Sequence, residues 1–193
     1  MNRRRYELKE RARRQEETRQ RIIDTTVALH REVGPAKTTV SEIARRAGVG
    51  RVTVYNHFPD DASLLGACSA RFIAGHPPPD PSAWEAIDDP ERRLRAALTE
   101  LYAWFRANEA MLANVRRDAA LIPALAAVVS SAEATAHETA MREALLAGRG
   151  RRRRVRAAIG LALAFPTWQR LARDEGLSDG EAVEVMAAAV AAA

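Results

Sequence analysis

Apolar residues recur along this chain at helical spacing, and no segment shows the strict alternation of a half-buried strand. One apolar stripe lies in residues 18–33, and a second lies in residues 40–47. Abundant alanine and an aromatic content of only 5% also favour packed helices over a sheet. The pattern therefore predicts an all-α protein. The first stripe consists of Ile22, Thr26, Leu29 and Val33.

Glycine and proline set the expected helix boundaries. Gly34-Pro35 should end the first helix, and the proline-rich segment 75–81 should form an extended linker. Pro166 should kink or split the helix that contains it. The expected helices are 18–33, 40–47, 50–57, 61–74, 89–107, 109–119, 122–147, 151–176 and 178–193.

The segment Thr39–Phe58 has the pattern of two short helices around a glycine turn. Thr39 and Glu42 fit a capping box at the start of the first helix. Gly48 stands where a left-handed C-cap is needed. Side chains that can bind phosphates and base edges lie on the exposed face of the second helix. They are Arg51, Thr53, Tyr55, Asn56 and His57. This arrangement predicts a DNA-binding helix-turn-helix, with Thr39 a further contact residue.

At these residues the chain resembles the tetracycline-repressor (TetR) family of bacterial transcription regulators. The resemblance rests on T-V-S-E-I-A-R-R-A-G-V followed by T-V-Y-N-H-F-P, and it covers about residues 18–72. It implies a three-helix DNA-binding domain, a helical domain that binds a small effector, and a homodimer on a palindromic operator. Two residues depart from the family pattern. Gly50 replaces the usual capping Ser or Asn, and Asp61 replaces a phosphate-binding Lys and should help to cap the fourth helix.

Charge and composition divide the chain into three parts. Residues 1–17 form an Arg/Glu-rich arm, either helical or disordered, that could touch DNA. Residues 18–74 are expected to be the helix-turn-helix domain, and residues 82–193 the ligand-binding and dimerisation domain. Residues 1–58 hold 14 Lys or Arg against 7 Asp or Glu, although the whole chain has a net charge of +5. The positive charge therefore gathers at the predicted DNA-binding end.

Aromatic and methionine residues of the second domain are candidates for an effector pocket. Apolar clefts with few polar groups are typical of small-molecule sites, so we expect a small, mostly apolar effector. The alternative is that these side chains are simply core. The candidates are Trp104, Phe105, Met111, Met141, Phe165 and Trp168, with Asn114 as a polar anchor.

The last two helices carry small and apolar residues that could form the dimer interface. The family resemblance implies that two such helices from each subunit make a four-helix interface, whereas the alternative is burial within one subunit. The residues are Ala157, Ala158, Leu161, Phe165, Val183, Met186, Ala187 and Val190.

No catalytic set, cofactor motif or metal-ligand cluster is recognisable in the sequence. The single cysteine, Cys68, excludes an internal disulfide framework and is expected to be buried. No apolar stretch is long enough for a transmembrane helix, and the N-terminus lacks the apolar region of a secretory signal. We therefore expect a cytoplasmic protein that is not an enzyme, and the family resemblance implies a ligand-responsive repressor. The alternatives are a ligand-independent, nucleoid-type DNA-binding protein and an enzyme in the second domain.

Overall fold

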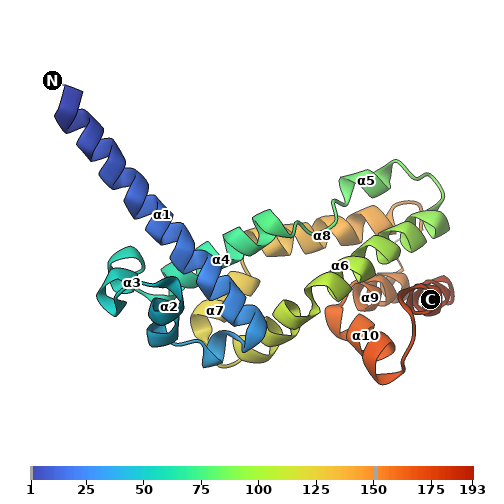
Figure 1. Cartoon of the computed structure of the whole chain (residues 1–193). Coiled ribbons are helices and arrows are strands. Elements are labelled where there is room, and N and C mark those ends of the chain that lie inside the picture. The colour runs from blue at the N-terminus through green and yellow to red at the C-terminus, as the bar shows by residue number, and fades with distance from the viewer. Residues whose placement is uncertain (1, 150–151) are drawn as a thin grey trace. The chain divides into compact units, whose positions relative to one another are not determined.

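The computed structural model describes residues 2–149 and 152–193, with side chains from Tyr6 onward (Figure 1). All regular elements in these ranges are helical, which confirms the predicted all-α class. The α-helices are α1 Asn2–Glu32, α2 Val40–Ala47, α3 Arg51–His57, α4 Asp61–Gly75, α5 Ser82–Glu85, α6 Pro90–Ala119, α7 Pro123–Val129, α8 Ala132–Leu146, α9 Arg153–Ala162, α10 Phe165–Gln169 and α11 Asp179–Ala191. A 3-10 turn covers Pro35–Lys37 and a π-helical turn covers Arg170–Asp174. Among the described helices, none has the length and hydropathy needed to cross a bilayer.

The chain forms two compact units that differ from the predicted division. Unit 1 runs to Pro77 and also includes Ala113–Val129, whereas unit 2 consists of Pro78–Leu112 and Ser130–Ala193. The sequence pattern had assigned the segment Ala113–Val129 to the second domain. The difference arises because α6 contributes residues to both units, and α7 packs on α4 in unit 1.

The helix α6 replaces two expected helices, 89–107 and 109–119. Asn108 lies at the junction of the two expected helices. Its side chain is buried, and its Nδ2 donates to the Trp104 carbonyl oxygen at 2.9 Å. This bond to residue i−4 keeps the amide within the helix, so the backbone continues unbroken.

The N-terminal arm is helical and continuous with α1, which extends from Asn2. Side chains one turn apart stabilise it: Arg13 pairs with Glu10 at 3.0 Å and with Glu17 at 2.9 Å. Such pairs contribute roughly 0.2–0.5 kcal/mol each, and the arm buries little apolar surface of its own. Of the two alternatives left open for residues 1–17, the structure supports the helix for the described residues 2–17.

Two expected long helices are broken. The helix predicted over 122–147 is two helices, because the Ser131 hydroxyl accepts the N–H of Ala134 and starts α8. Pro166 lies in the first turn of α10 and separates it from α9, so the predicted split is confirmed.

The core of unit 1 is formed by α1, α2, α3 and α4. Ile22, Ile23 and Leu29 of α1 are buried with residues of the other three helices, and Cys68 is buried as expected. Val33 ends the predicted stripe but is exposed, because α1 stops at Glu32 and Val33 lies in the turn that follows.

The core of unit 2 includes the apolar face of α11 that was predicted to form the dimer interface. The side chains of Val183, Met186, Ala187 and Val190 are at most 4% exposed within a single subunit. They belong to the same buried cluster as Ile159 of α9. For these four residues, the structure supports the alternative of burial within the subunit.

Candidate nucleic-acid interface

The turn between α2 and α3 follows the predicted local geometry. The Thr39 hydroxyl accepts the N–H of Glu42 at 3.2 Å, and Gly48 takes a left-handed conformation with φ of 66°. Only half of the predicted capping box is observed, because the Glu42 carboxylate binds Arg45 and Arg46. These two guanidinium groups lower the pKa of Glu42 to about 2. The arginines of α2 therefore already have an anionic partner.

The helix α3 is held by its inner face and leaves its outer face free. Val54 and Phe58 are buried, 1% and 3% exposed, in the core of unit 1. Arg51, Tyr55 and Asn56 are exposed, and no carboxylate in the described residues pairs with Arg51. Thr53 and His57 are partly buried beside them, and Thr39 is exposed at the start of α2. The structure thus places the six predicted DNA-contact residues in one helix-turn-helix.

One exposed side chain of α3 was missed by the sequence analysis. Val52 is 72% exposed, although valine is normally buried. An apolar group on this face suits the methyl group of thymine, which is the apolar feature of the major groove. The signal available in the sequence was its position next to Arg51 and Thr53, opposite the buried Val54.

The two departures from the family pattern lie at helix starts. Gly50 is the N-cap of α3 and has no side chain that could accept a backbone N–H. The cap of α4 is Asp60, whose Oδ1 accepts the N–H of Ser63 at 2.7 Å. The sequence pattern predicted that Asp61 helps to cap this helix, but the capping residue is its neighbour Asp60. Asp61 lies exposed in the first turn.

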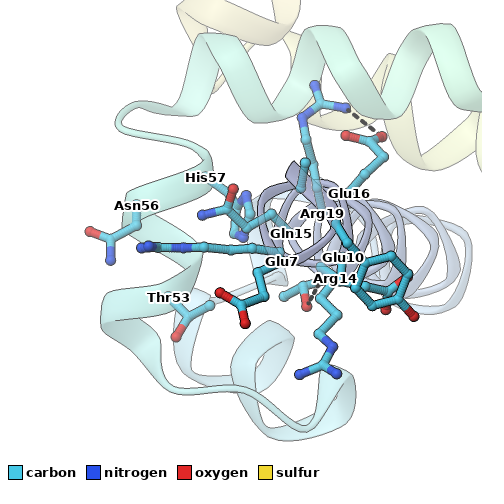
Figure 2. A pocket seen from close by; sticks show the side chains of 13 residues that line it. Glu7, Glu10, Arg14, Gln15, Glu16, Arg19, Thr53, Asn56 and His57 are labelled. Carbon is cyan, nitrogen blue, oxygen red and sulfur yellow. Dashed lines mark hydrogen bonds and ion pairs between the residues drawn. The ribbon is translucent and has the colours of Figure 1, made fainter. Parts of the chain in front are cut away.

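A groove of about 1030 Å³ lies between α3 and the N-terminal part of α1 (Figure 2). Thr53, Asn56 and His57 form the α3 side. The opposite side consists of residues of α1 between Tyr6 and Arg19. The sequence alone gave no indication of this groove, because its second wall exists only if the arm is helical.

Comparison with known proteins agrees with this geometry. The family model for bacterial regulatory proteins of the tetR family matches residues 22–68, which include α2, α3 and about half of α4. The transcriptional regulator BetI of Serratia proteamaculans (strain 568) is 41% identical over 58 residues, which cover 30% of this chain and 29% of BetI. A protein of Mesorhizobium loti MAFF303099, described as a TetR-family transcriptional regulator, has the same fold over 93% of this chain and 96% of its own, with a TM-score of 0.62 and 20% identity. The match to the tetR-family model is confined to residues 22–68, and over nearly the whole chain the similarity is one of fold.

The TetR-family likeness differs between the two ends of the chain. The matches to the first curated relatives span at most 40% of their length. Over nearly the whole chain, the multidrug binding protein EbrR, whose structure holds imidazole, is 26% identical. The structural match covers 90% of this chain and 89% of EbrR, with a TM-score of 0.53. The relatives named here are transcriptional regulators or, for EbrR, a binding protein.

Four of the seven predicted pocket residues lie together in unit 2. The ring centroid of Phe105 is 5.4 Å from Phe165, 5.8 Å from Trp104 and 6.0 Å from Trp168. Met141 is buried in the same core. We call Trp104, Phe105, Phe165 and Trp168 the aromatic cluster. It is a packed arrangement, because Trp168 is 0% exposed and Phe105 is 6% exposed.

Polar side chains close over the outer edge of Trp168. Its Nε1 donates to Asp179 Oδ1 at 2.8 Å, and Asp179 also binds Arg106 with two hydrogen bonds. Arg106 and Arg173 lie 5.6 and 5.7 Å from the centroid of the indole ring. The Arg106 guanidinium lowers the pKa of Asp179, which keeps the carboxylate charged for both partners.

The remaining two candidates are not part of the aromatic cluster. Asn114 belongs to unit 1, and its Nδ2 donates to the carbonyl oxygens of His30 and Arg31, each at 3.0 Å. Its amide therefore completes the C-terminal end of α1, where helix carbonyls lack partners. Met111 is buried, but it is not a member of the buried cluster that contains Trp168. Among the described residues, no group of three His, Cys, Asp or Glu is placed to hold a metal.

Proposed function

We propose that this protein is a transcriptional repressor that binds double-stranded DNA as a homodimer and releases it when a small effector binds. The observation that carries the proposal is α3, which is fixed by Val54 and Phe58 and presents a polar outer face. A rigid helix with a free polar face is what insertion into the major groove requires.

The residues of α3 can be assigned different roles. Arg51 can bind a phosphate or a guanine edge, and Asn56 can bind an adenine edge. Val52 can contact a thymine methyl group, whereas Tyr55 and His57 can donate to phosphates. In this assignment Arg51, Val52 and Asn56 contact bases, and Tyr55 and His57 contact the DNA backbone.

Selection of duplexes from a randomised pool, followed by footprinting, tests this function. A repressor should enrich one palindromic duplex and protect two half-sites about one helical turn apart. The ligand-independent architectural protein would instead protect no discrete sequence. Arg51→Ala should either reduce the slope of log affinity against log salt by about 0.9 or relax one base position. A pool that shows no enrichment would refute the proposed function.

For the homodimer, we propose the exposed faces of α9 and α11 as the interface. Leu161 is 57% exposed and Val185 is 46% exposed, and exposed alanines lie one turn away, Ala157 from Leu161 and Ala188 and Ala189 from Val185. We therefore place the dimer contact on these exposed residues and not on the buried face of α11. Small residues there would let helices of two subunits approach closely.

Two aspartate substitutions separate this interface from the core. Leu161→Asp should leave the subunit folded but convert dimers to monomers in sedimentation velocity, because the charge would be buried only in the dimer. Val190→Asp places the charge among residues of the unit 2 core, so it should destabilise the subunit itself by several kcal/mol, of the order of 3–5. A Leu161→Asp protein that remains dimeric would place the interface elsewhere.

For the effector, we propose that an apolar compound enters unit 2 by separating the aromatic cluster. The multidrug binding protein EbrR, with the same fold, gives this proposal its support. The helix α6 carries Phe105 in unit 2 and Asn114 in unit 1, so a shift of α6 would act on the α1 carbonyls that Asn114 binds.

A library screen that monitors tryptophan emission and DNA release tests the effector proposal. An effector should change both signals, and Asn114→Ala should retain the emission change while losing part of the DNA release. Compounds that release DNA without affecting tryptophan emission would place the effector elsewhere.

A further inference from the structure

The helical arm of α1 gives the candidate DNA-binding surface a second wall. The groove of about 1030 Å³ has Thr53, Asn56 and His57 on one side and α1 side chains on the other, and both sides belong to unit 1 (Figure 2). At a rise of about 1.5 Å per residue, residues 2–17 extend α1 by roughly 24 Å. That length equals at most about seven base pairs of duplex, at about 3.4 Å each.

Some charged side chains of the arm have ion-pair partners, and others do not. Three carboxylates line the groove: Glu10 pairs with Arg13 at 3.0 Å, Glu16 lies 4.0 Å from Arg19, and Glu7 is the third. Arg11 and Arg14 also line the groove, and neither forms an ion pair with a described side chain. The α1 wall therefore offers two guanidinium groups that are available for an external anion.

The lining of the groove suits a nucleic-acid backbone better than an apolar effector. Small-molecule pockets are mostly apolar, whereas this groove is lined by three guanidinium groups, three carboxylates, and amide, hydroxyl and imidazole groups. The guanidinium, amide and hydroxyl groups are of the kind that hydrogen-bond to phosphates and sugars in protein–DNA complexes. The groove is also continuous with the polar face of α3, because Thr53 and Asn56 line it.

We propose that the groove holds the sugar–phosphate backbone of one DNA strand, with Arg11 and Arg14 as phosphate ligands. This proposal rests on the proposed DNA-binding function and adds the arm to its contact surface. The helix α3 lies in the major groove on one side of the strand, and the arm lies along the strand on its other side. Phosphate contacts of this kind fix the register of a recognition helix without selecting bases.

Two double variants with equal changes in charge test the proposal. Arg11→Ala with Arg14→Ala removes the two groove arginines, and Lys9→Ala with Arg21→Ala removes two exposed basic residues of α1 that do not line the groove. Alanine favours helix, so both proteins should keep the arm helical, which circular dichroism can verify. The probe is the duplex selected by the wild-type protein from the randomised pool.

The groove variant should reduce the slope of log affinity against log salt by about 1.8, with roughly tenfold or greater loss of affinity at low salt. The control variant should keep the wild-type slope. Arg11→Lys with Arg14→Lys should also keep it, since a lysine serves as a point charge for phosphate. Hydroxyl-radical footprinting should show that only the groove variant loses protection of the backbone next to each half-site.

Equal slope changes in the two alanine variants would overturn the proposal, because the arm would then act only through its total charge. An unchanged slope and footprint in the groove variant would overturn it as well. If the wild-type protein selects no duplex, the proposed function fails, and this inference fails with it.

Discussion

The two units present their candidate functional side chains in opposite ways. In unit 1, Tyr55 is 52% exposed and Arg51 pairs with no described carboxylate. In unit 2, Trp168 is 0% exposed, and its indole is bonded to Asp179 and covered by two guanidinium groups. A DNA-contacting face can bind without rearrangement, whereas an effector must first separate side chains that now pack on one another.

This contrast assigns different energetic roles to the candidate site residues of the two units. Exposed polar residues of α3 contribute little to folding, so substitution there should affect binding alone. Residues of the aromatic cluster contribute to stability, so substitution there should affect folding whether or not an effector enters. The affinity of an effector is reduced by the free energy that opening requires.

Among the variants that test this contrast between the units, Trp168→Ala is expected to have the largest effect. Removing a fully buried indole should lower the free energy of unfolding by about 3–5 kcal/mol, and it also leaves Asp179 without one of its donors. Denaturant unfolding measured by far-UV circular dichroism checks this. Trp168→Phe is the matched variant, which keeps an aromatic ring and should lose less. A loss below about 1 kcal/mol for the alanine variant would mean that the cluster is not closely packed in solution.

Unit 1 should respond to acid through His30. Its side chain is 6% exposed, and burial lowers its pKa to about 4, although the charge of Asp118 acts in the opposite direction. Asp118 itself is bound by Arg117 and by the N–H of Ala36. Because the folded-state pKa lies below the unfolded value of about 6.5, the unfolded state binds more protons on acidification. Stability is fully present above about pH 6.5 and is lost as pH falls towards 4.

The expected loss is about 3 kcal/mol between these pH values. Unfolding titrations at pH 7.5 and pH 4.5 measure it, and His30→Gln should flatten the dependence because glutamine does not titrate. If the wild-type protein and the variant lose stability equally, groups other than His30 are responsible. The loss of stability in acid would then not distinguish unit 1 from unit 2.

A smaller effect, confined to binding, is expected for Tyr55. Tyr55→Ala should weaken binding to the selected duplex by about 1–3 kcal/mol, the scale of a hydrogen bond to a charged group. Its exposure predicts an unfolding free energy within about 0.5 kcal/mol of wild type. Gel-shift titration at fixed salt gives the first value. Tyr55→Phe removes only the hydroxyl group, so equal losses in both variants would identify that hydroxyl as the contact. Unchanged affinity in both would remove Tyr55 from the interface.

The helix-turn-helix could be predicted because its signals are local. Thr39 caps its own helix, Gly48 takes the left-handed conformation that its position requires, and the apolar spacing of residues 40–47 marks the buried face. Each of these depends on residues within two turns. The exposed face of α3 followed from the same pattern, since Val54 and Phe58 define its inner side.

Features that depend on distant residues could not be predicted. Whether the apolar face of α11 meets α9 of its own subunit or a partner cannot be decided from spacing, and Val190 proved to be core. Arg93 shows the same limitation. It is buried and donates to the carbonyl oxygens of Ala144 and Ala147, whereas the adjacent Arg92 has the same local character in the sequence. The groove likewise depends on an arm whose helix has no apolar stripe to predict it.

The smallest effect is expected for Gly50→Ser, which tests whether α3 is fully formed in the free protein. Gly50 is the N-cap of α3 with φ of −77° and ψ of 152°, an extended conformation that any residue can adopt. A Cβ at this position would meet only the Thr53 hydroxyl oxygen, at 3.7 Å. Gly50→Ser would supply an oxygen for a free N–H at the start of α3 and should stabilise the helix by a few tenths of a kcal/mol. Hydrogen exchange of the α3 amides should slow by up to about twofold, and affinity for the selected duplex should rise to a similar extent.

Gly50→Ala adds the same Cβ without an acceptor and should instead speed exchange, because alanine is a poorer N-cap than glycine. Identical exchange rates in the two variants would show that α3 is already fully formed in the free protein, and the absence of a capping side chain would then have no consequence for DNA binding.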